Sequence, residues 1–347
     1  MSKTGPVERT SGDAMASAEN AIGMPALIGP APPPVTVGLP VYNGEHYLSS
    51  SLASLLSQTY EDFELLISDN CSDDATEEIC RTAARSDPRI RYERQDRNVG
   101  VIENHNWLVR NARSPFFTWA SSDDAYAPER IERMYVALQN DDKAVLAFTW
   151  ARQIDENDAQ VGSWHNPCRT AHPDPAVRLY DLLALVHENY HCYGLVRRNV
   201  MLRTMLEPPV WNSDRILVAE LTLHGPFVEV AEELLWHRLH DRRVSASLTH
   251  RQFYATQRMN IPRIVAPSAE EGYWYLRAVL RSPVRGRDRV RTLAALRPWL
   301  RDNWMRVGYH LARGVTDGVL ELVGLRGRSL RDQRARRVMS QKGGLDG

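Results

Sequence analysis

Two apolar segments that each end in a cluster of acidic residues constrain the fold of this chain more than any other feature. The run 63–68 is followed by Asp69-Asn70-Cys71-Ser72-Asp73-Asp74, and the run 116–120 is followed by Ser121-Ser122-Asp123-Asp124. In open α/β sheets, the loops that leave the carboxyl ends of neighbouring strands converge on one crevice, where small molecules bind. We therefore predict that both clusters belong to one site, where one cluster holds a base or a ribose and the other a metal ion and phosphates.

Strand-like and helix-like segments alternate from residue 35 to residue 150. This alternation predicts an α/β fold with a mostly parallel, Rossmann-like sheet that is flanked by helices. The expected strands are 36–39, 63–68, 90–92, 116–120 and 145–150. The expected helices are 45–57, 75–85, 103–111 and a helix through residue 138 that Pro128 opens.

The second half of the chain predicts more helices. A polar stretch over residues 152–174 is a candidate lid; it precedes expected helices at 177–187 and 214–223 and two short strands at 227–230 and 234–239. After Asp241 the chain is predicted to be helical to its end. One face of that extension carries apolar residues at helical spacing: Leu300, Trp304, Val307, Leu311, Val315, Val319 and Leu322.

The composition, 43% apolar and 25% charged over 347 residues, is that of a globular protein with a sizeable core. No apolar stretch has the length of a membrane-spanning helix, and acidic residues interrupt the amino terminus where a secretory signal would be apolar. Residues 1–34 are rich in Ala, Gly, Ser and Pro and are predicted to be a disordered leader. The four cysteines show no zinc spacing, so we expect buried thiols in a reducing, cytoplasmic compartment.

Charge is distributed unevenly along the chain. The net charge is zero overall, but residues 281–340 contain 15 basic and 5 acidic residues, which leaves a net charge of −10 on residues 1–280. The basic segment is either a solvated helical bundle or a surface that meets an anionic partner such as a membrane or nucleic acid.

The turn after the first expected strand, Leu39-Pro40-Val41-Tyr42-Asn43-Gly44-Glu45, excludes two common nucleotide motifs. It is not GxGxxG, and no GxxxxGK[ST] occurs in the chain. The turn offers Tyr42 for stacking on a base and Glu45 at a helix start, although an ordinary turn with a helix cap fits the segment equally well. A nucleotidyl transferase normally needs a Gly-rich basic loop at this position. The absence of such a loop makes nucleotidyl transfer the least favoured activity for this chain.

Three further loops carry candidate ligands. Asp69 can accept a hydrogen bond from a base or a ribose, with Ser72 or Asp73 capping the next helix. Gly100, in Asn98-Val99-Gly100, permits close approach of the backbone to a ligand. Adjacent carboxylates repel one another unless a cation or a basic group compensates, so the pair Asp123-Asp124 indicates a hard cation such as Mg²⁺ or Mn²⁺.

In this order and spacing, the motifs resemble the family 2 glycosyltransferases, which have the nucleotide-diphospho-sugar transferase (GT-A) fold. The resemblance runs from Thr36 to Pro128 through Pro40-Val41-Tyr42-Asn43, Glu45, Ser57-Gln58-Thr59-Tyr60, Phe63-Glu64-Leu65, Asp69-Asn70, Ser72-Asp73, Asn98-Val99-Gly100 and Asp123-Asp124. It implies a donor-binding set of Pro40, Val41, Tyr42, Asn43, Glu45, Asp69, Asn98, Gly100, Ser122 and Asp123. It also implies a divalent cation, Mg²⁺ or Mn²⁺, at Asp123, the last Asp of the DXD motif; in this chain Ser121 replaces the first Asp of that motif.

The resemblance extends to the acceptor half. It implies that Asp214, which opens an expected helix, is the catalytic base; a helix cap is the plainer interpretation of the same residue. It implies that His240 joins the metal or the diphosphate, where a surface histidine is the alternative. Tyr193 and Arg197 are expected in the acceptor pocket.

These expectations combine into one functional hypothesis. The chain is expected to be an inverting glycosyltransferase that moves a sugar from a nucleotide-diphospho-sugar to an acceptor hydroxyl in polysaccharide, glycolipid or other glycoconjugate assembly. The expected domains are a catalytic domain at 35–250, with a donor half at 35–150 and an acceptor half at 151–250, and a basic helical extension at 251–347. The extension is predicted either to contact the inner face of a membrane, because lipid-linked acceptors are common in this family, or to pack on the catalytic domain; no nucleic-acid partner is expected. An inactive sugar-nucleotide-binding protein is the alternative function.

Overall fold

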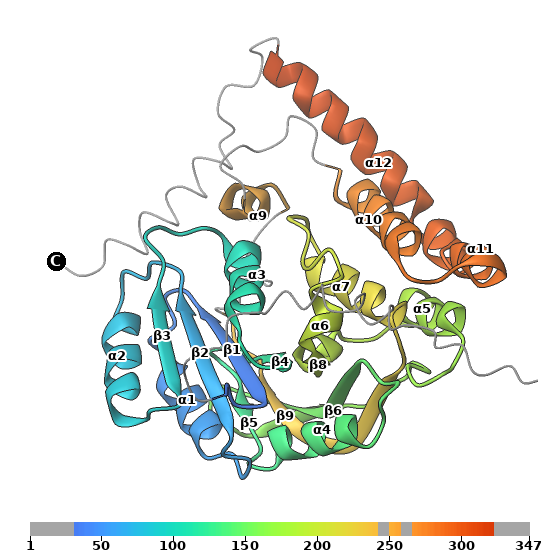
Figure 1. Ribbon diagram of the computed structural model, residues 1–347. Helices are drawn as coiled ribbons and strands as arrows, with labels where there is room; N and C mark the ends of the chain where they lie inside the picture. The colour runs from blue at the N-terminus through green and yellow to red at the C-terminus, as the bar shows by residue number, and fades with distance from the viewer. Residues whose placement is uncertain (1–30, 242–249, 258–265, 323–347) are drawn as a thin grey trace, which may run out of the picture. The chain divides into compact units, whose positions relative to one another are not determined.

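The computed structural model describes residues 31–241, 250–257 and 266–322 and is built around a nine-stranded sheet (Figure 1). The strands are β1 Val35–Val41, β2 Phe63–Asp69, β3 Ile90–Arg94, β4 Phe116–Trp119, β5 Ala125–Tyr126, β6 Leu146–Ile154, β7 Gln160–Trp164, β8 Leu195–Arg197 and β9 Phe227–Arg238. Their order is β3-β2-β1-β4-β8-β6-β9-β5, and β7 pairs with β6. The predicted leader lies outside the described residues except for residues 31–34.

The first four strands are parallel. Val35 of β1 pairs with Phe63 of β2 and with Phe116 of β4, and β2 pairs in parallel with β3. Strands β1 and β2 are almost continuously apolar because both faces of this half of the sheet are covered. The loops after β1, β2 and β4 therefore leave the same edge, as the acidic loops predict.

The other strands make the sheet mixed. Strand β8 is antiparallel to both β4 and β6, β6 is parallel to β9, and β5 is antiparallel to β9 with Ala125 opposite Trp236. The α/β class predicted from the sequence is confirmed. The pairing of β5 with β9 brings the end of β9 beside the loop that follows β4.

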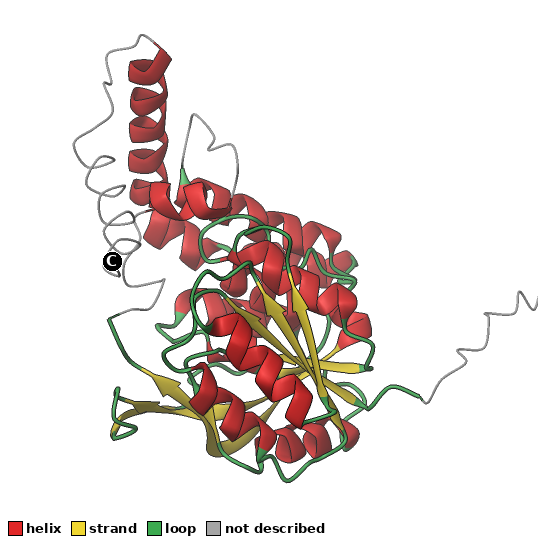
Figure 2. Ribbon diagram, turned by 90° about the vertical axis from the view of Figure 1, so that its left-hand side faces the viewer, coloured by secondary structure: helices red, strands yellow, loops and turns green. Residues whose placement is uncertain are grey.

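Helices cover both faces of the sheet (Figure 2). In chain order they are α1 Leu48–Leu56, α2 Thr76–Ser86, α3 Val101–Asn111, α4 Arg130–Gln139, α5 Pro175–Ala184, the 3₁₀ helix η1 Tyr190–Tyr193, α6 Arg198–Met201 and α7 Ser213–Thr222. The strand order changes direction after β3, and because such crossovers are right-handed, α3 packs on the face opposite to α1 and α2. Leu39, Leu65, Phe117 and Leu195 are fully buried in the resulting core.

Four more helices follow: α9 His250–Gln257, α10 Pro267–Arg281, α11 Gly286–Ala294 and α12 Arg297–Leu322. They form a second apolar core with α5 and α7, in which Leu179, Ile216 and Val279 are buried. Helix α12 packs closely on α10 at Gly272, where the absence of a side chain leaves room for the ring of Trp299. A Cβ added to Gly272 would lie only 2.6 Å from that ring. Part of the extension therefore packs on the domain that precedes it.

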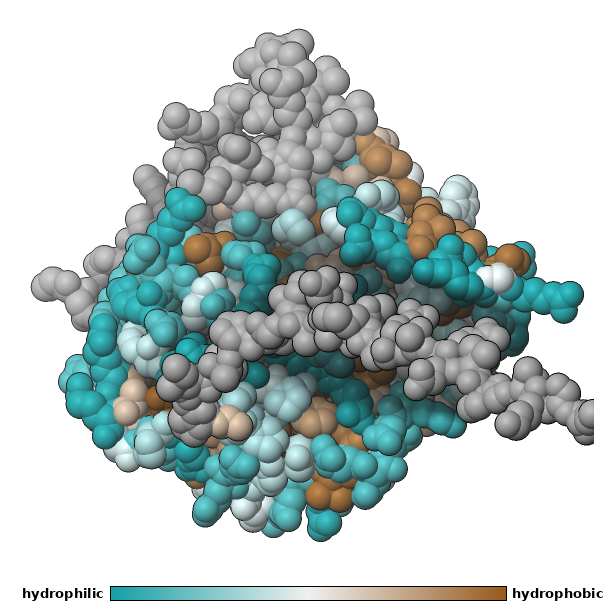
Figure 3. Space-filling model, viewed as in Figure 1, coloured by the Kyte–Doolittle hydropathy of each residue, from teal (hydrophilic) through white to brown (hydrophobic). Residues whose placement is uncertain are grey.

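The apolar residues predicted to form one amphipathic face of the extension differ in their burial. Val307 is half-buried against the second core, whereas Leu300, Trp304 and Leu311 are 53%, 66% and 43% exposed. Figure 3 shows hydrophobic residues along α12 beside hydrophilic ones. No helix among residues 31–241, 250–257 and 266–322 has the length and apolar character to cross a membrane.

Three local expectations differ from the structure. The stretch expected to be a lid is mostly a β-hairpin, in which β7 pairs with β6 over Ala151↔Trp164 to Ile154↔Gln160. The two strands expected at 227–239 are one strand, β9, which is continuous past register shifts opposite Trp150. Of the four free cysteines, Cys80 and Cys168 are buried as expected, but Cys71 and Cys192 are partly exposed.

Candidate active site

The turn after β1 and the loop after β2 are tied together by side chains. The amide of Asn43 donates to Ser72 Oγ at 3.0 Å, and Asn43 Nδ2 donates to Asp73 Oδ1 at 2.6 Å. Glu45 Oε2 accepts from the amide of Ala75 at 3.0 Å, while the amide of Glu45 donates to Asp74 Oδ2 at 3.1 Å. Asn43 and Glu45 therefore hold the two loops at a fixed separation, a structural role in addition to the donor-binding role predicted for them.

Asp69 is enclosed within this arrangement. Its side chain is fully buried; Oδ1 accepts from the amide and the hydroxyl of Ser72 at 2.9 and 2.6 Å, and Oδ2 accepts from Tyr92 Oη at 2.8 Å. Burial, and then this hydrogen bond, raise the pKa of Tyr92. Because both carboxylate oxygens already hold protein donors, Asp69 shapes the loop that would meet a ligand.

Helix α2 is capped differently from the prediction. Ser72 or Asp73 was expected to cap it, but the first amides of the helix are bound by Asp74 Oδ1, which accepts from Thr76, and by Glu45 from the neighbouring loop. Ser72 is instead occupied by Asp69. The expectation is wrong because a residue distant in sequence supplies one of the two caps.

The third loop supports the start of α3. Asn98 Oδ1 accepts from Asn70 Nδ2 at 3.0 Å and from the amide of Gly100 at 2.9 Å. Gly100 has φ +88° and ψ 156°, a backbone conformation that is open almost only to glycine. The neighbour of Gly100 in space is α9, where Gln257 Oε1 accepts from the amide of Ile102 at 3.0 Å. The close approach permitted at Gly100 is thus to a helix of the same chain.

The acidic loop after β4 meets the end of β9. Asp123 Oδ2 lies 2.9 Å from His240 Nε2, and Asp123 Oδ1 accepts from the hydroxyl of Ser121. The Asp123 side chain is 29% exposed, whereas that of His240 is 5% exposed. The structure therefore brings together the two residues predicted to hold a metal ion, although they are 117 positions apart in the sequence.

Arg238 holds the acidic loop in place through hydrogen bonds, and sequence reasoning did not assign it to the site. It is buried; its backbone amide donates to Asp124 Oδ1 at 3.0 Å, and its Nε donates to the carbonyl of Asp123 at 2.9 Å. Its guanidinium also contacts the hairpin turn, at Asp158 Oδ1, and lies 4.8 Å from the centre of the Tyr47 ring. The only sequence signal for it was its place in the strand that ends in Arg-x-His.

The loops after β1, β4 and β9 converge at one edge. A Cβ on Gly44 would lie 3.4 Å from Ser122 Oγ, and the ring of Tyr47 lies 4.9 Å from that of His240. Tyr42, with 49% of its surface exposed, is available at this edge for stacking. Pro40 and Val41 end β1 just before the turn.

A separate pocket of about 170 Å³ contains Asp214. It is lined by Val101, Ile102, His105, Trp119, Cys192, Tyr193, Glu207, Ser213, Asp214 and Phe253. Trp119 ends β4, and the first three residues come from the start of α3, so the pocket lies at the same sheet edge as the acidic loop. Tyr42, Asp69 and Asp123 do not line it.

Asp214 is held within this pocket as a carboxylate of raised pKa. Burial is the main cause of the rise and the nearby Glu207 carboxylate is the second, while a 2.8 Å hydrogen bond from Asn189 Nδ2 opposes it. The N-cap of α7 is Asn212, so Asp214 lies inside the first turn rather than at the cap. A carboxylate with a raised pKa in a pocket has the properties of a general base.

Cys192 and Tyr193 connect the pocket to the acidic loop. Burial raises the pKa of Cys192, and the carboxylates of Asp214, Glu207 and Asp124 raise it further. The pKa of Tyr193 is raised by burial first and then by Cys192, Asp124 and Asp123. This short segment is therefore close to both groups of carboxylates, and Tyr193 lines the pocket.

Arg197 does not belong to the pocket, contrary to its predicted role. It pairs with Phe116 at the amino end of β4, the opposite end from Trp119. Its guanidinium donates to the carbonyls of Ala144 and Leu138, both at 2.8 Å. Its physical role is to satisfy backbone carbonyls at the end of α4.

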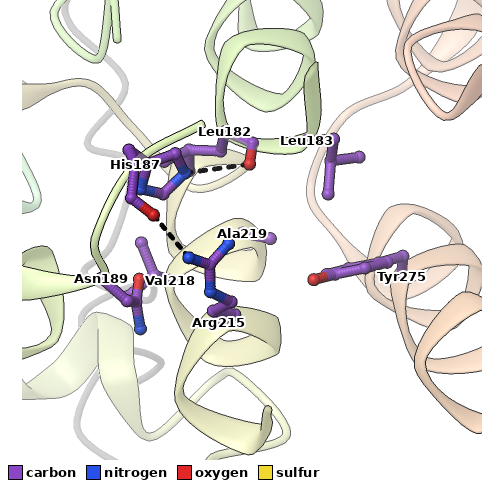
Figure 4. Close-up of a pocket in the computed structure, with 8 residues that line it drawn as sticks. All are labelled: Leu182, Leu183, His187, Asn189, Arg215, Val218, Ala219 and Tyr275. Carbon is purple, nitrogen blue, oxygen red and sulfur yellow. Dashed lines mark hydrogen bonds between the residues drawn. The ribbon is translucent and has the colours of Figure 1, made fainter. Parts of the chain in front are cut away.

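A second, smaller cavity lies on the other side of Asn189 and has a volume of about 10 Å³ (Figure 4). Arg215 reaches into it and donates to the carbonyl of His187, whose ring in turn contacts the carbonyl of Leu182 at 3.0 Å. Arg215 is therefore directed away from the pocket of Asp214, although it follows Asp214 in sequence. Asn189 lines this cavity and fixes the orientation of Asp214 from behind.

Solved structures with the same fold include proteins that bind nucleotide sugars. The structure of S. aureus TarS in complex with UDP-GlcNAc is similar with a TM-score of 0.60 and 14% identity over 82% of this chain and 81% of that one. The mannosyltransferase PcManGT from Pyrobaculum calidifontis in complex with GDP-Man and Mn²⁺ gives a TM-score of 0.52 and 16% identity over 93% and 85%. At these identities the likeness shows the fold, which is the GT-A fold.

The sequence comparison gives the family. Residues 36–203 match the model described as glycosyl transferase family 2, and this region forms a glycosyltransferase domain of that family. An uncharacterized glycosyltransferase of Methanocaldococcus jannaschii is 33% identical over 127 residues, which are 36% of this chain and 44% of that protein. The chain spans less than half the length of this curated relative.

Proposed function

We propose that this chain transfers a sugar, with inversion, from a nucleotide-diphospho-sugar to an acceptor hydroxyl in the assembly of a polysaccharide, glycolipid or other glycoconjugate. The observation that carries the proposal is Asp214, a carboxylate of raised pKa in a pocket at the sheet edge that also holds the acidic loop. The family membership of residues 36–203 supports the reaction class, and the nucleotide sugars bound by the two similar structures support the donor class.

On the donor side, the exposed ring of Tyr42 would stack on the nucleobase, beside the loops that Asn43, Glu45, Asp69 and Asn98 hold in place. The backbone at Pro40, Val41 and Gly100 and the side chain of Ser122 complete the proposed donor surface. These contacts set the position of the donor relative to Asp214.

Asp123 and His240 are suited to a divalent cation, because a carboxylate oxygen and an imidazole nitrogen 2.9 Å apart offer the oxygen and nitrogen ligands that Mn²⁺ accepts. Among residues 31–241, 250–257 and 266–322, no cluster of three or more His, Cys, Asp or Glu side chains is arranged for a metal ion. A bound cation would therefore take its other ligands from the donor diphosphate and water, and it would neutralise the charge of that diphosphate. The Mn²⁺ in the PcManGT structure supports this cofactor.

The proposed reaction is a single displacement. Asp214 removes the proton from an acceptor hydroxyl, the oxygen forms a bond to the anomeric carbon, and the bond from that carbon to the diphosphate breaks with the electron pair on the leaving group. Glu207 is the other carboxylate in the pocket, but both of its oxygens are hydrogen-bonded, by His105 and by Ser213. This occupancy favours direct displacement over a covalent intermediate on a second carboxylate.

A donor screen tests the proposal. The full chain is incubated with a panel of UDP-, GDP- and dTDP-sugars with Mn²⁺, and nucleoside diphosphate release is measured together with thermal unfolding. Release with at least one donor supports transferase activity. Thermal protection by a donor without any release supports the alternative, a protein that binds sugar nucleotides without turnover.

We also propose that α12 contacts an anionic membrane surface on the cytoplasmic side. Leu300, Trp304 and Leu311 are exposed on one side of the helix, with Arg297 and Arg301 beside them. Sedimentation with vesicles that contain phosphatidylglycerol is the test: a Trp304→Glu variant should bind at least fivefold more weakly than the unchanged chain. Equal sedimentation with neutral and anionic vesicles would contradict the proposal.

A further inference from the structure

A histidine–carboxylate pair in the pocket of Asp214 has no role in the reaction described above. Glu207 is 6% exposed; its Oε1 lies 3.0 Å from His105 Nδ1, and its Oε2 accepts from Ser213 Oγ at 2.8 Å. Its backbone is also held, since the amide donates to Asn106 Oδ1 at 3.0 Å and the carbonyl accepts from Asn106 Nδ2 at 2.8 Å. Glu207 is thus fixed between α3 and α7 by four hydrogen bonds.

This contact determines how His105 faces the pocket. A carboxylate accepts hydrogen bonds only, so Nδ1 of His105 carries a proton, and in this tautomer Nε2 is the acceptor. His105 lines the pocket, and its side chain is 27% exposed. Among the described residues, no hydrogen bond to its Nε2 is found, so this atom is available to a ligand hydroxyl.

The rest of the pocket wall is apolar or acidic. Trp119, Tyr193 and Phe253 contribute aromatic rings, and Val101 and Ile102 contribute aliphatic surface. The charged lining residues are Glu207 and Asp214, and no Lys or Arg lines the pocket in the part of the chain that the structure describes. Aromatic surface with a few oriented polar groups suits the apolar face and hydroxyls of a sugar ring, whereas an anionic group would meet two carboxylates.

Building on the function proposed above, we propose that this pocket selects an uncharged acceptor ring. That ring is a sugar or similar polyhydroxylated ring with no carboxylate or phosphate near the reacting hydroxyl. His105 Nε2 accepts a hydrogen bond from a second hydroxyl of the ring, while Asp214 takes the proton of the reacting one. Glu207 acts through His105 as a positioning residue. The volume of about 170 Å³ is below the range of about 300 to 1,000 Å³ that encloses drug-sized ligands, so one ring enters rather than a chain of rings.

Matched acceptor pairs test this inference in the full chain. With a donor identified by nucleotide release, transfer is measured to methyl glucoside and methyl glucuronide, and to methyl N-acetylglucosaminide and its 6-phosphate. In whichever of these two pairs is used more efficiently, we expect kcat/KM to be at least tenfold higher for the neutral acceptor than for the acidic one. His105→Ala should raise the acceptor KM about tenfold.

Glu207→Gln distinguishes an electrostatic role of Glu207 from a purely structural one, because only the electrostatic role predicts a change in the preference for neutral over acidic acceptors. Because the substitution removes one negative charge from the pocket wall, it should reduce the discrimination against the acidic member of each pair at least threefold. His165 and Glu233 form a matched control, since they make a similar contact at 3.3 Å outside the pocket and the His165 side chain is 57% exposed. His165→Ala and Glu233→Gln should leave the acceptor KM and the discrimination unchanged.

The result that overturns the inference is a preference for the acidic acceptors, or an acceptor KM in His105→Ala equal to that of the control variant. Isothermal titration with the same glycosides makes the same comparison without turnover. Absence of nucleotide release with every donor would overturn the proposed transferase function alone, because the titration would still decide between neutral and acidic rings.

Discussion

Replacing Gly100 by alanine is predicted to destabilise the protein by about 2 to 4 kcal/mol. The φ of +88° and ψ of 156° are unfavourable for any residue with a Cβ, which costs about 1 to 3 kcal/mol. The added Cβ would also lie 2.9 Å from both the carbonyl of Thr256 and Gln257 Oε1. Since one of these is backbone, α9 must shift, and the hydrogen bond from the Ile102 amide to Gln257 is lost at a further cost of about 0.5 to 1.5 kcal/mol.

Substitutions at two other glycines distinguish the cost of backbone strain from the cost of the steric contact with α9. Gly286 has φ +58°, but a Cβ added to it would meet no atom within 4 Å, so Gly286→Ala should cost only the backbone strain, about 1 to 2 kcal/mol. Gly308 lies within α12, also with open space around it, and Gly308→Ala should stabilise by about 0.5 to 1 kcal/mol. Urea denaturation followed by circular dichroism ranks the three variants. Equal losses for Gly100→Ala and Gly286→Ala would refute the contact between α9 and the start of α3.

Three further predictions concern charge. Burial lowers the pKa of His191 to about 3, so between about pH 6.5 and pH 3 the unfolded chain binds a proton that the folded chain does not. Stability should fall by up to about 1.4 kcal/mol per pH unit as the pH drops through this window, and His191→Gln should reduce that slope in urea titrations; an unchanged slope contradicts the buried neutral ring. Glu207→Gln removes a cause of the raised pKa of Asp214, so the acid limb of the pH profile of kcat/KM should move to lower pH, and a limb that stays or rises would count against that coupling. Asp123→Ala should weaken donor binding at least tenfold in Mn²⁺ but much less in EDTA, as titration calorimetry can measure; equal affinity in Mn²⁺ would remove Asp123 as a cation ligand.

The first half of the fold could be predicted because its signals are local. The strands β1, β2 and β4 are short apolar runs that end in polar loops, and pairing in register along β1 then places those loops at one edge. The proximity of Asp123 and His240 followed from the family resemblance, and the structure shows its cause in the pairing of β5 with β9.

The remaining features depend on contacts that no local pattern encodes. Arg197 is only four positions after Tyr193, which lines the pocket. Because β8 runs antiparallel to β4, however, Arg197 lies beside Phe116 at the amino end of β4, away from the pocket. Glu207 lies in an irregular segment, and only its contacts with α3 and α7 bring it beside His105 and Asp214. The capping of α2 by Glu45 and the packing of α9 against Gly100 likewise depend on contacts between segments that are far apart in sequence.

The central claim is that Asp214 is the base of a transferase, and Asp214→Asn tests it most directly. Asparagine keeps the size of the side chain but cannot take a proton from the acceptor. Acceptor-dependent release of nucleoside diphosphate should fall by about 10² to 10⁴, while donor affinity stays within about twofold because Asp214 lies in the pocket and not in the acidic loop. Turnover equal to that of the unchanged chain would contradict the account.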